Sequence, residues 1–194
     1  DMSAEIADAA LALTDISDDG LFVEVKAEYA KEMVTGFIQL DGVTVGAVAN
    51  RTAIYDENGE KAEEFAAVLT TDGAYKAAEF VTFCNAFEIP VLSLTNVKGF
   101  EANVRAEKTI AKAAAKLVYA FSNADVPKVN VITGEAYGSA YVAMNSKSVG
   151  ADMVYAWSQA SIGMMDASLA AKIMYADEIA AADDVTAKIN EKAS

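Results

Sequence analysis

Apolar positions in this chain follow two spacings, one typical of buried strands and one typical of helices. Two β-rich runs, Met33–Leu40 and Val43–Asn50, flank Asp41-Gly42, and Asp-Gly between such runs predicts a β-hairpin. Gly46 inside the second run indicates a close neighbour or a bulge. The same reasoning predicts further short strands at Phe22–Lys26, Val91–Leu94, Val129–Thr133 and Ala151–Trp157.

Helical spacing predicts two long amphipathic helices between these strands. The first begins at Asp72-Gly73, ends before Pro90 and places Phe80 and Cys84 on its apolar face. The second spans Arg105–Asn123, with Leu117 and Phe121 inward and with Lys108, Lys112 and Lys116 as a solvated stripe. Shorter helices are predicted at Ser3–Ala12, Ala27–Ala30, Asp166–Tyr175 and the acidic C-terminus, and loops at Asp15–Gly20, Ile54–Glu64 and Thr95–Phe100.

Strands and helices alternate after the hairpin, which predicts an α/β layer protein built from right-handed ββα turns. The length of 194 residues fits one domain with a sizeable core. No internal repeat or linker interrupts the pattern.

Charge and composition exclude several classes of function. The net charge of −14 argues against nucleic acid as a ligand, because phosphate binding needs clustered Lys and Arg. No apolar run approaches the length of a membrane span and no basic, apolar leader is present, so we expect a cytoplasmic protein.

The chain contains no histidine and a single cysteine, Cys84. Ser-His-Asp and Cys-His catalysis in their usual forms are therefore excluded, as are zinc sites built on imidazole. Cys84 lies on an apolar helical face and is expected to be a buried hydrophobe. The acids of Asp15–Gly20 lack the spacing of a calcium loop, so we expect a solvated turn and no metal site.

Two turns carry the candidate chemistry. One follows the strand at Val129–Thr133 and contains Glu135–Tyr141, and the other surrounds Gly99-Phe100. Small residues at a helix start leave free backbone N–H groups, which can bind an anion or an oxygen that gains negative charge. Such a turn is also compatible with tight packing alone.

Several separate stretches resemble the C-terminal half of the carboxyltransferase subunit of biotin-dependent acyl-CoA carboxylases, of the propionyl-CoA and methylmalonyl-CoA type. The similarity runs from Lys31 to Met174, in matching order and spacing. The stretches are Met33–Phe37, Val45–Asn50, Lys76–Val81, Cys84–Pro90, Val97–Phe100, Ala115–Ala120, Val126–Val129, Ala136–Tyr141, Met144–Lys147 and Gly150–Asp152.

The resemblance implies a crotonase-like ββα spiral and a single half-domain, with residues 1–194 forming the carboxybiotin side and the N-terminal acyl-CoA half outside this chain. It implies that the backbone N–H groups of Ser139 and Ala140 form an oxyanion hole for the biotin ureido oxygen. Gly99, Phe100, Tyr137 and Gly138 would contact the cofactor. Biotin would arrive on a carrier domain, the substrate would be an acyl-CoA, and the partners would be the N-terminal half, the biotin carboxyl carrier and biotin carboxylase in an oligomer.

The sequence departs from the family pattern near both turns. Ser139 stands where the family usually has glycine, Gly134 and Glu135 replace two basic residues, and Lys98 replaces proline. Residues Ala102-Asn103 replace a Pro-Gly pair. These changes leave open a decarboxylase or transcarboxylase variant.

Two further functions remain open from the residues. A crotonase-type hydratase, isomerase or thioesterase would need a carboxylate base near the oxyanion hole, for which Glu135 and Asp166 are the candidates. Each is expected to be an exposed or capping acid. The other alternative is a non-catalytic assembly fragment. Because the acyl-CoA half would be missing, we expect the isolated 194 residues to have negligible carboxyltransferase activity.

Overall fold

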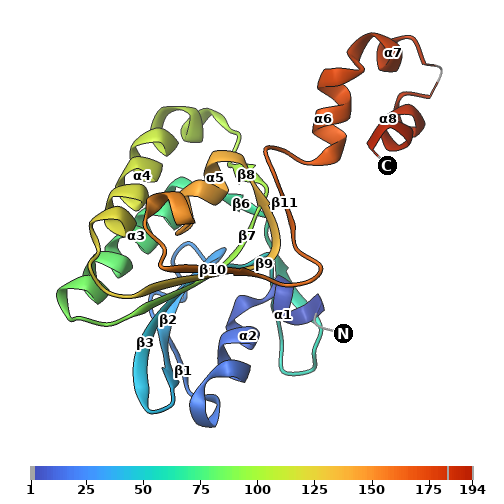
Figure 1. Ribbon diagram of the computed structural model, residues 1–194. Helices are drawn as coiled ribbons and strands as arrows, with labels where there is room; N and C mark the ends of the chain where they lie inside the picture. The colour runs from blue at the N-terminus through green and yellow to red at the C-terminus, as the bar shows by residue number, and fades with distance from the viewer. Residues whose placement is uncertain (1–2, 183, 194) are drawn as a thin grey trace.

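A computed structural model describes residues 3–182 and 184–193, and it has an α/β architecture built on one mixed sheet (Figure 1). The sheet has seven strands in the order β1-β2-β3-β7-β9-β10, and β11 also pairs with β9. The strands are β1 (Phe22–Glu24), β2 (Met33–Leu40), β3 (Val43–Asn50), β7 (Val91–Val97), β9 (Lys128–Tyr137), β10 (Met153–Ala156) and β11 (Ser161–Gly163).

Helices cover both faces of this sheet (Figure 1). α3 (Thr71–Ala86), α4 (Val104–Asn123) and α5 (Gly138–Ala143) lie on one face, and α2 (Ala9–Ile16) packs on the other. The remaining helices are α1 (Ser3–Ala7), α6 (Ala167–Met174), α7 (Ala176–Ala180) and α8 (Val185–Ala193), with short 3₁₀ helices η1 (Asp18–Gly20) and η2 (Lys147–Val149).

The core forms two layers because side chains alternate across each strand. Met33 and Val48 belong to the cluster under α3 and α4, whereas Val34 and Ala47 belong to the cluster under α2. All four are at most 1% exposed. The central strands are therefore buried on both faces, which is the usual condition of parallel strands flanked by helices.

The predicted hairpin and the alternating pattern that follows it are confirmed. β2 and β3 pair antiparallel from Met33↔Asn50 to Leu40↔Val43, whereas β3, β7, β9 and β10 run parallel. Gly46 does have a close neighbour, because an added Cβ would lie 2.5 Å from the Cys84 sulfur.

The predictions for the first 30 residues need three corrections. The helix expected over Ser3–Ala12 is broken at Asp8, whose carboxylate accepts the Ala10 N–H and caps α2. The loop expected at Asp15–Gly20 is α2's last turn followed by η1. The helix expected at Ala27–Ala30 is a series of turns, with Ala30 at a φ of 45°.

Two segments predicted as loops contain strands. Within Ile54–Glu64, β4 (Ala53–Tyr55) pairs antiparallel with β5 (Lys61–Glu64). Within Thr95–Phe100, β7 continues to Val97, and β8 (Gly99–Phe100) pairs with β6 (Val68–Leu69). The acidic C-terminal segment forms two helices, α7 and α8, where a single one was expected.

The last three helices form an arm that stands away from the sheet, drawn at the red end of the chain in Figure 1. α6 packs against α7 and α8. Large apolar side chains remain exposed on α6 and just before it, including Met164 at 84%, Ile173 at 62% and Met174 at 73%.

Candidate functional site

The candidate site lies where β9 passes directly into α5. The turn predicted over Glu135–Tyr141 is corrected here, because β9 continues through Tyr137 and the helix begins at Gly138. β11 makes this extension possible by pairing in parallel with the end of β9, from Ser161↔Glu135 to Gly163↔Tyr137.

Gly138 is the residue that permits the tight passage from strand to helix. Its φ is +58°, in the left-handed region, and a Cβ there would lie 3.0 Å from the Met164 carbonyl oxygen. A side chain at this position would be strained by the backbone angle and crowded by the neighbouring chain.

The first turn of α5 offers backbone N–H donors. The N–H groups of Ser139 and Ala140 belong to that turn, where a helix has no internal acceptor for them. The preceding residue, Tyr137, makes no side-chain cap. Ser139 is exposed and Ala140 is buried, so the two donors lie at the boundary between core and surface.

The fold places the second predicted turn, at Gly99-Phe100, next to the first, at the start of α5. β8, which consists of Gly99 and Phe100, contacts α5. Phe100 packs against the core cluster below α5, whereas an added Cβ at Gly99 would meet no atom within 4 Å. The structure thus places the two turns side by side, with open space at Gly99.

Tyr137 connects the site to β11. Its side chain is 8% exposed, and its hydroxyl donates to the Ser161 hydroxyl at 2.7 Å. An added Cβ at Gly163 would lie 3.6 Å from the same ring. Tyr137 therefore holds the segment that passes over the start of α5.

A buried amide cluster, which sequence reasoning missed, fixes the other end of α5. Asn130 donates to the Met144 carbonyl at 3.2 Å, and Thr95 donates to the Asn130 side-chain oxygen at 2.8 Å. Asn145 donates to the Ser93 hydroxyl at 2.9 Å, and its own side-chain oxygen is buried without a partner. The alternating polar residues Ser93, Thr95 and Asn130 inside otherwise apolar strands were the available signal.

Asn96 ties β9 to β7 just before the site. Its side-chain oxygen accepts the Glu135 N–H at 3.0 Å, and its amide nitrogen donates to the Ile6 carbonyl at 3.3 Å. The register between β7 and β9 shifts next to Asn96. Gly134 permits this approach, because a Cβ there would lie 2.5 Å from the Asn96 side-chain oxygen.

The two acids considered as bases have structural partners. Asp166 caps α6 by accepting the Leu169 N–H at 2.9 Å, which confirms its expected role. Glu135 is 32% exposed and forms an ion pair with Lys98 at 3.1 Å. Glu135 is thus a partly exposed, charge-paired acid.

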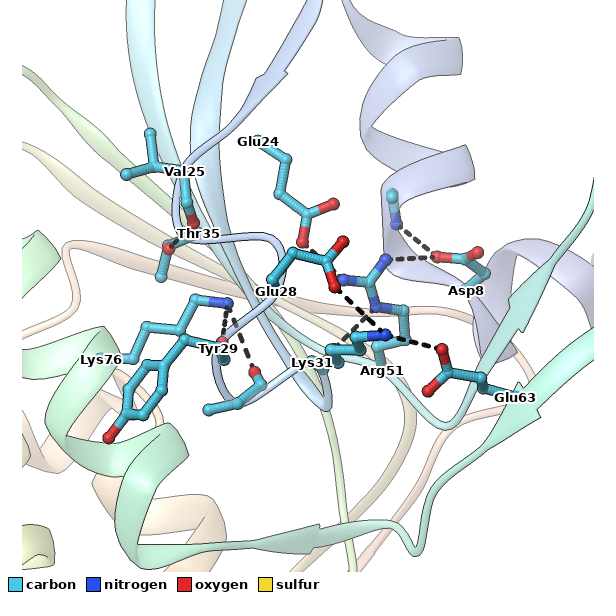
Figure 2. Close-up of polar contacts among 12 residues, drawn as sticks. Asp8, Glu24, Val25, Glu28, Tyr29, Lys31, Thr35, Arg51, Glu63 and Lys76 are labelled. Carbon is cyan, nitrogen blue, oxygen red and sulfur yellow. Dashed lines mark hydrogen bonds and ion pairs between the residues drawn. The ribbon is translucent and has the colours of Figure 1, made fainter.

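A second polar cluster lies beyond the site, beneath the turn that connects β1 to β2 (Figure 2). Arg51 is buried and pairs with Glu24 at 2.5 Å and with Asp8 at 3.5 Å. Nearby, Lys76 is 1% exposed and its ammonium donates to the Tyr29 carbonyl at 2.8 Å and to the Ala30 carbonyl at 3.3 Å. Burial lowers the pKa of Lys76 to about 8.

Three other features raised by the sequence are Cys84, the acidic residues and the apolar segments. Cys84 is fully buried as expected, and burial raises the pKa of its thiol to about 12. Among the residues that the structure describes, no group of three or more acids or cysteines could hold a metal. No described helix is long and apolar enough to cross a membrane.

Comparison with known proteins assigns the family. The family model described as the carboxyl transferase domain matches residues 3–194 of this sequence. The chain belongs to the carboxyl transferase domain family. It is 44% identical to the propionyl-CoA carboxylase beta chain of Roseobacter denitrificans over 84% of this chain and 30% of that protein. It is 42% identical to the methylmalonyl-CoA carboxyltransferase 12S subunit of Propionibacterium freudenreichii, over 91% of this chain and 32% of that subunit.

The carboxyl transferase domain also superposes on a solved structure. The crystal structure of transcarboxylase 12S, whose description names a hexamer assembly with methylmalonyl-coenzyme A and methylmalonic acid bound, matches with a TM-score of 0.83 and 39% identity. The match covers 100% of this chain and 36% of that chain. The crotonase-like α/β fold is thereby confirmed, and the chain spans about a third of the length of these relatives.

Proposed function

We propose that this carboxyl transferase domain is the carboxybiotin side of an enzyme that moves a carboxyl group between biotin and an acyl-CoA. The observation that carries the proposal is the start of α5, where Ser139 and Ala140 present N–H groups beside β8. Family membership over residues 3–194 supports this proposal.

The residues at this point fit a biotin ring system. Gly99 faces open space, and Phe100 supplies an apolar wall beside α5. Ser139 retains its N–H, so its presence in place of the family's usual glycine preserves the donor pair. Gly99, Phe100, Tyr137 and Gly138 would hold the cofactor, and bound carboxybiotin would supply the carboxyl group.

The role of the protein is electrostatic preorganisation. The two N–H donors are fixed by the end of β9, by the Tyr137 contact and by the amide cluster below α5. Donors held in this way stabilise an oxygen that gains negative charge, with no reorganisation when the charge develops. The chain has no histidine, and a backbone oxyanion hole needs none.

We further propose that the active site is completed by an N-terminal half that binds the acyl-CoA. The exposed Met164, next to the start of α5, and the exposed apolar side chains of α6, among them Ile173 and Met174, support a docking surface for that half. The biotin carrier and biotin carboxylase would be further partners in an oligomer, and the location would be cytoplasmic.

The activity is tested with the full-length protein that contains this chain. We expect transfer of a labelled carboxyl group from a carboxylated biotin carrier to propionyl-CoA, or its reverse from methylmalonyl-CoA, and we expect the isolated 194 residues to be inactive. Robust turnover by the isolated chain would contradict the two-half arrangement.

The competing hydratase, isomerase or thioesterase function can be separated in the same preparation. That function needs a carboxylate base, so Glu135→Gln or Asp166→Asn would abolish it. We expect both variants to retain carboxyl transfer, because Glu135 pairs with Lys98 and Asp166 caps α6. If instead hydratase or thioesterase turnover is found and disappears in either variant, the proposed function is wrong.

A further inference from the structure

The last part of β9 is separated from the regular sheet by a bulge. The pairing register with β7 shifts between Thr95 and Val97, so that residues 133–135 of β9 lie opposite Asn96 alone. β10 pairs with β9 before the bulge, and β11 pairs with the end of β9. Bulges between parallel strands are rare, and bulges in general gather next to active sites, where they redirect the chain. The bulge therefore sets the direction in which β9 enters α5.

Side chains of β7 and β9 hold this bulge in place. The Asn96 amide, which is buried, accepts the Glu135 N–H at 3.0 Å and donates to the Ile6 carbonyl at 3.3 Å. An N–H only donates and a carbonyl oxygen only accepts, so the two contacts define one orientation of the amide. At the start of the bulge, the Thr133 hydroxyl donates to the Thr95 carbonyl at 3.3 Å. The bulge is thus attached to β7 at both of its ends.

A second asparagine fixes the backbone of Asn96. Asn50, the last residue of β3, is buried, and its side-chain oxygen accepts the Asn96 N–H at 3.2 Å. The two asparagines therefore connect the carboxyl ends of three neighbouring strands, β3, β7 and β9. Buried polar networks rigidify the structure around them when their bonds are made. The position of the Glu135 N–H is consequently tied to the centre of the sheet.

The backbone between the bulge and the N–H donors of α5 is short and restrained. Only Ala136, Tyr137 and Gly138 separate Glu135 from Ser139. The first two of them belong to β9, are buried and pair with β11. A paired, buried strand has little freedom to absorb a displacement of its neighbour. Movement of the bulge would therefore change the direction of the N–H groups at the start of α5.

We propose that Asn96 is a positioning residue for carboxyl transfer, which directs the Ser139 and Ala140 N–H groups by holding the bulge of β9. Asn96 acts through the Glu135 N–H and not on the reacting atoms. Donors stabilise a developing charge best when their direction is fixed before the reaction, and a displacement of about 1 Å can cost about 100-fold in rate. This role rests on the proposed function, because it requires the two donors to take part in the reaction.

The test is a double-mutant cycle of Asn96→Ala and Ala140→Pro in the full-length protein that contains this chain. Asn96→Ala alone should lower kcat about tenfold, with the KM for the acyl-CoA unchanged because the proposed acyl-CoA site lies on the other half. In the Ala140→Pro background the same change should lower kcat by no more than about threefold, because one of the two donors that Asn96 directs is gone. A loss of folded protein would instead lower kcat by the same factor in both backgrounds.

Two further variants complete the test. Val81→Ala, in the core on α3 where that helix packs on β2 and β3, should lose stability but keep kcat within about twofold of the wild type. Asn50→Ala should lower kcat about threefold in the same cycle, and it decides if Asn96→Ala does not fold. The positioning role is overturned if kcat is unchanged, if it falls equally in both backgrounds, or if Val81→Ala loses as much. If Ala140→Pro alone leaves kcat unchanged, the proposed function itself is wrong.

Discussion

Replacing Lys76 by methionine should remove a specific pH dependence of stability. The amine is 1% exposed and its pKa is about 8, below the ordinary value of 10.5, because burial disfavours the charged form. Glu24 opposes this shift and Arg51 adds to it. Between pH 8 and 10.5 the unfolded chain therefore binds more protons at this lysine than the folded chain does.

The sign and size of the effect follow from proton linkage. Stability rises with pH wherever the unfolded state binds more protons. The buried charge thus lowers stability below pH 8, and this cost is relieved as the pH rises toward 10.5. A lysine with these two pKa values gains about 2.5 kcal/mol of folding stability between pH 7 and pH 10.

The measurement is urea unfolding of the wild-type chain and of Lys76→Met at pH 7 and pH 10, followed by circular dichroism. The difference between the two proteins should change by about 2.5 kcal/mol in favour of the wild type as the pH rises. Lys112→Met, on the exposed face of α4, is the control and should show no such change. If the difference between wild type and Lys76→Met is the same at both pH values, Lys76 is charged to the same extent in both states and the assigned burial effect is wrong.

Two other predictions rest on the packing. Gly134→Ala should destabilise the chain by about 3 kcal/mol, because its Cβ would displace the Asn96 amide and break two partly buried hydrogen bonds. Gly99→Ala should change the free energy of unfolding by less than about 1 kcal/mol, because its Cβ would meet no neighbouring atom. If thermal melts show the same loss of stability for Gly134→Ala and Gly99→Ala, the steric explanation is wrong. Cys84 should react with a thiol reagent at pH 8 only as fast as the chain unfolds, since its thiol is buried with a pKa of about 12; rapid labelling of the native chain would contradict this.

The sequence allowed the hairpin and the two long helices to be predicted because their signals are local. Asp41-Gly42 fixes the turn between β2 and β3, and the spacing of Phe80 and Cys84 matches their burial on α3. β5 was missed because Lys61–Glu64 has exposed, charged residues with low strand propensity. Its strand conformation depends on pairing with β4, which no local pattern reveals.

The candidate site was only partly predictable for the same reason. Small residues indicated the start of a helix near Gly138, but the extension of β9 to Tyr137 depends on β11, a strand from a distant part of the chain. The contact between β8 and α5 is likewise a product of the fold. The burial of Lys76 could have been inferred from its helical spacing with Phe80, although lysine at such a position usually reaches solvent.

One pair of variants of the full-length protein tests directly whether the Ala140 N–H stabilises charge during carboxyl transfer. Ala140→Pro deletes the N–H within the first helical turn, where proline is tolerated, and Ala140→Gly retains it. We predict a loss of about 100-fold or more in kcat for Ala140→Pro, as for other oxyanion-hole donors, with activity near the wild type for Ala140→Gly. Equal kcat values for the two folded variants would show that this N–H does not take part in the reaction.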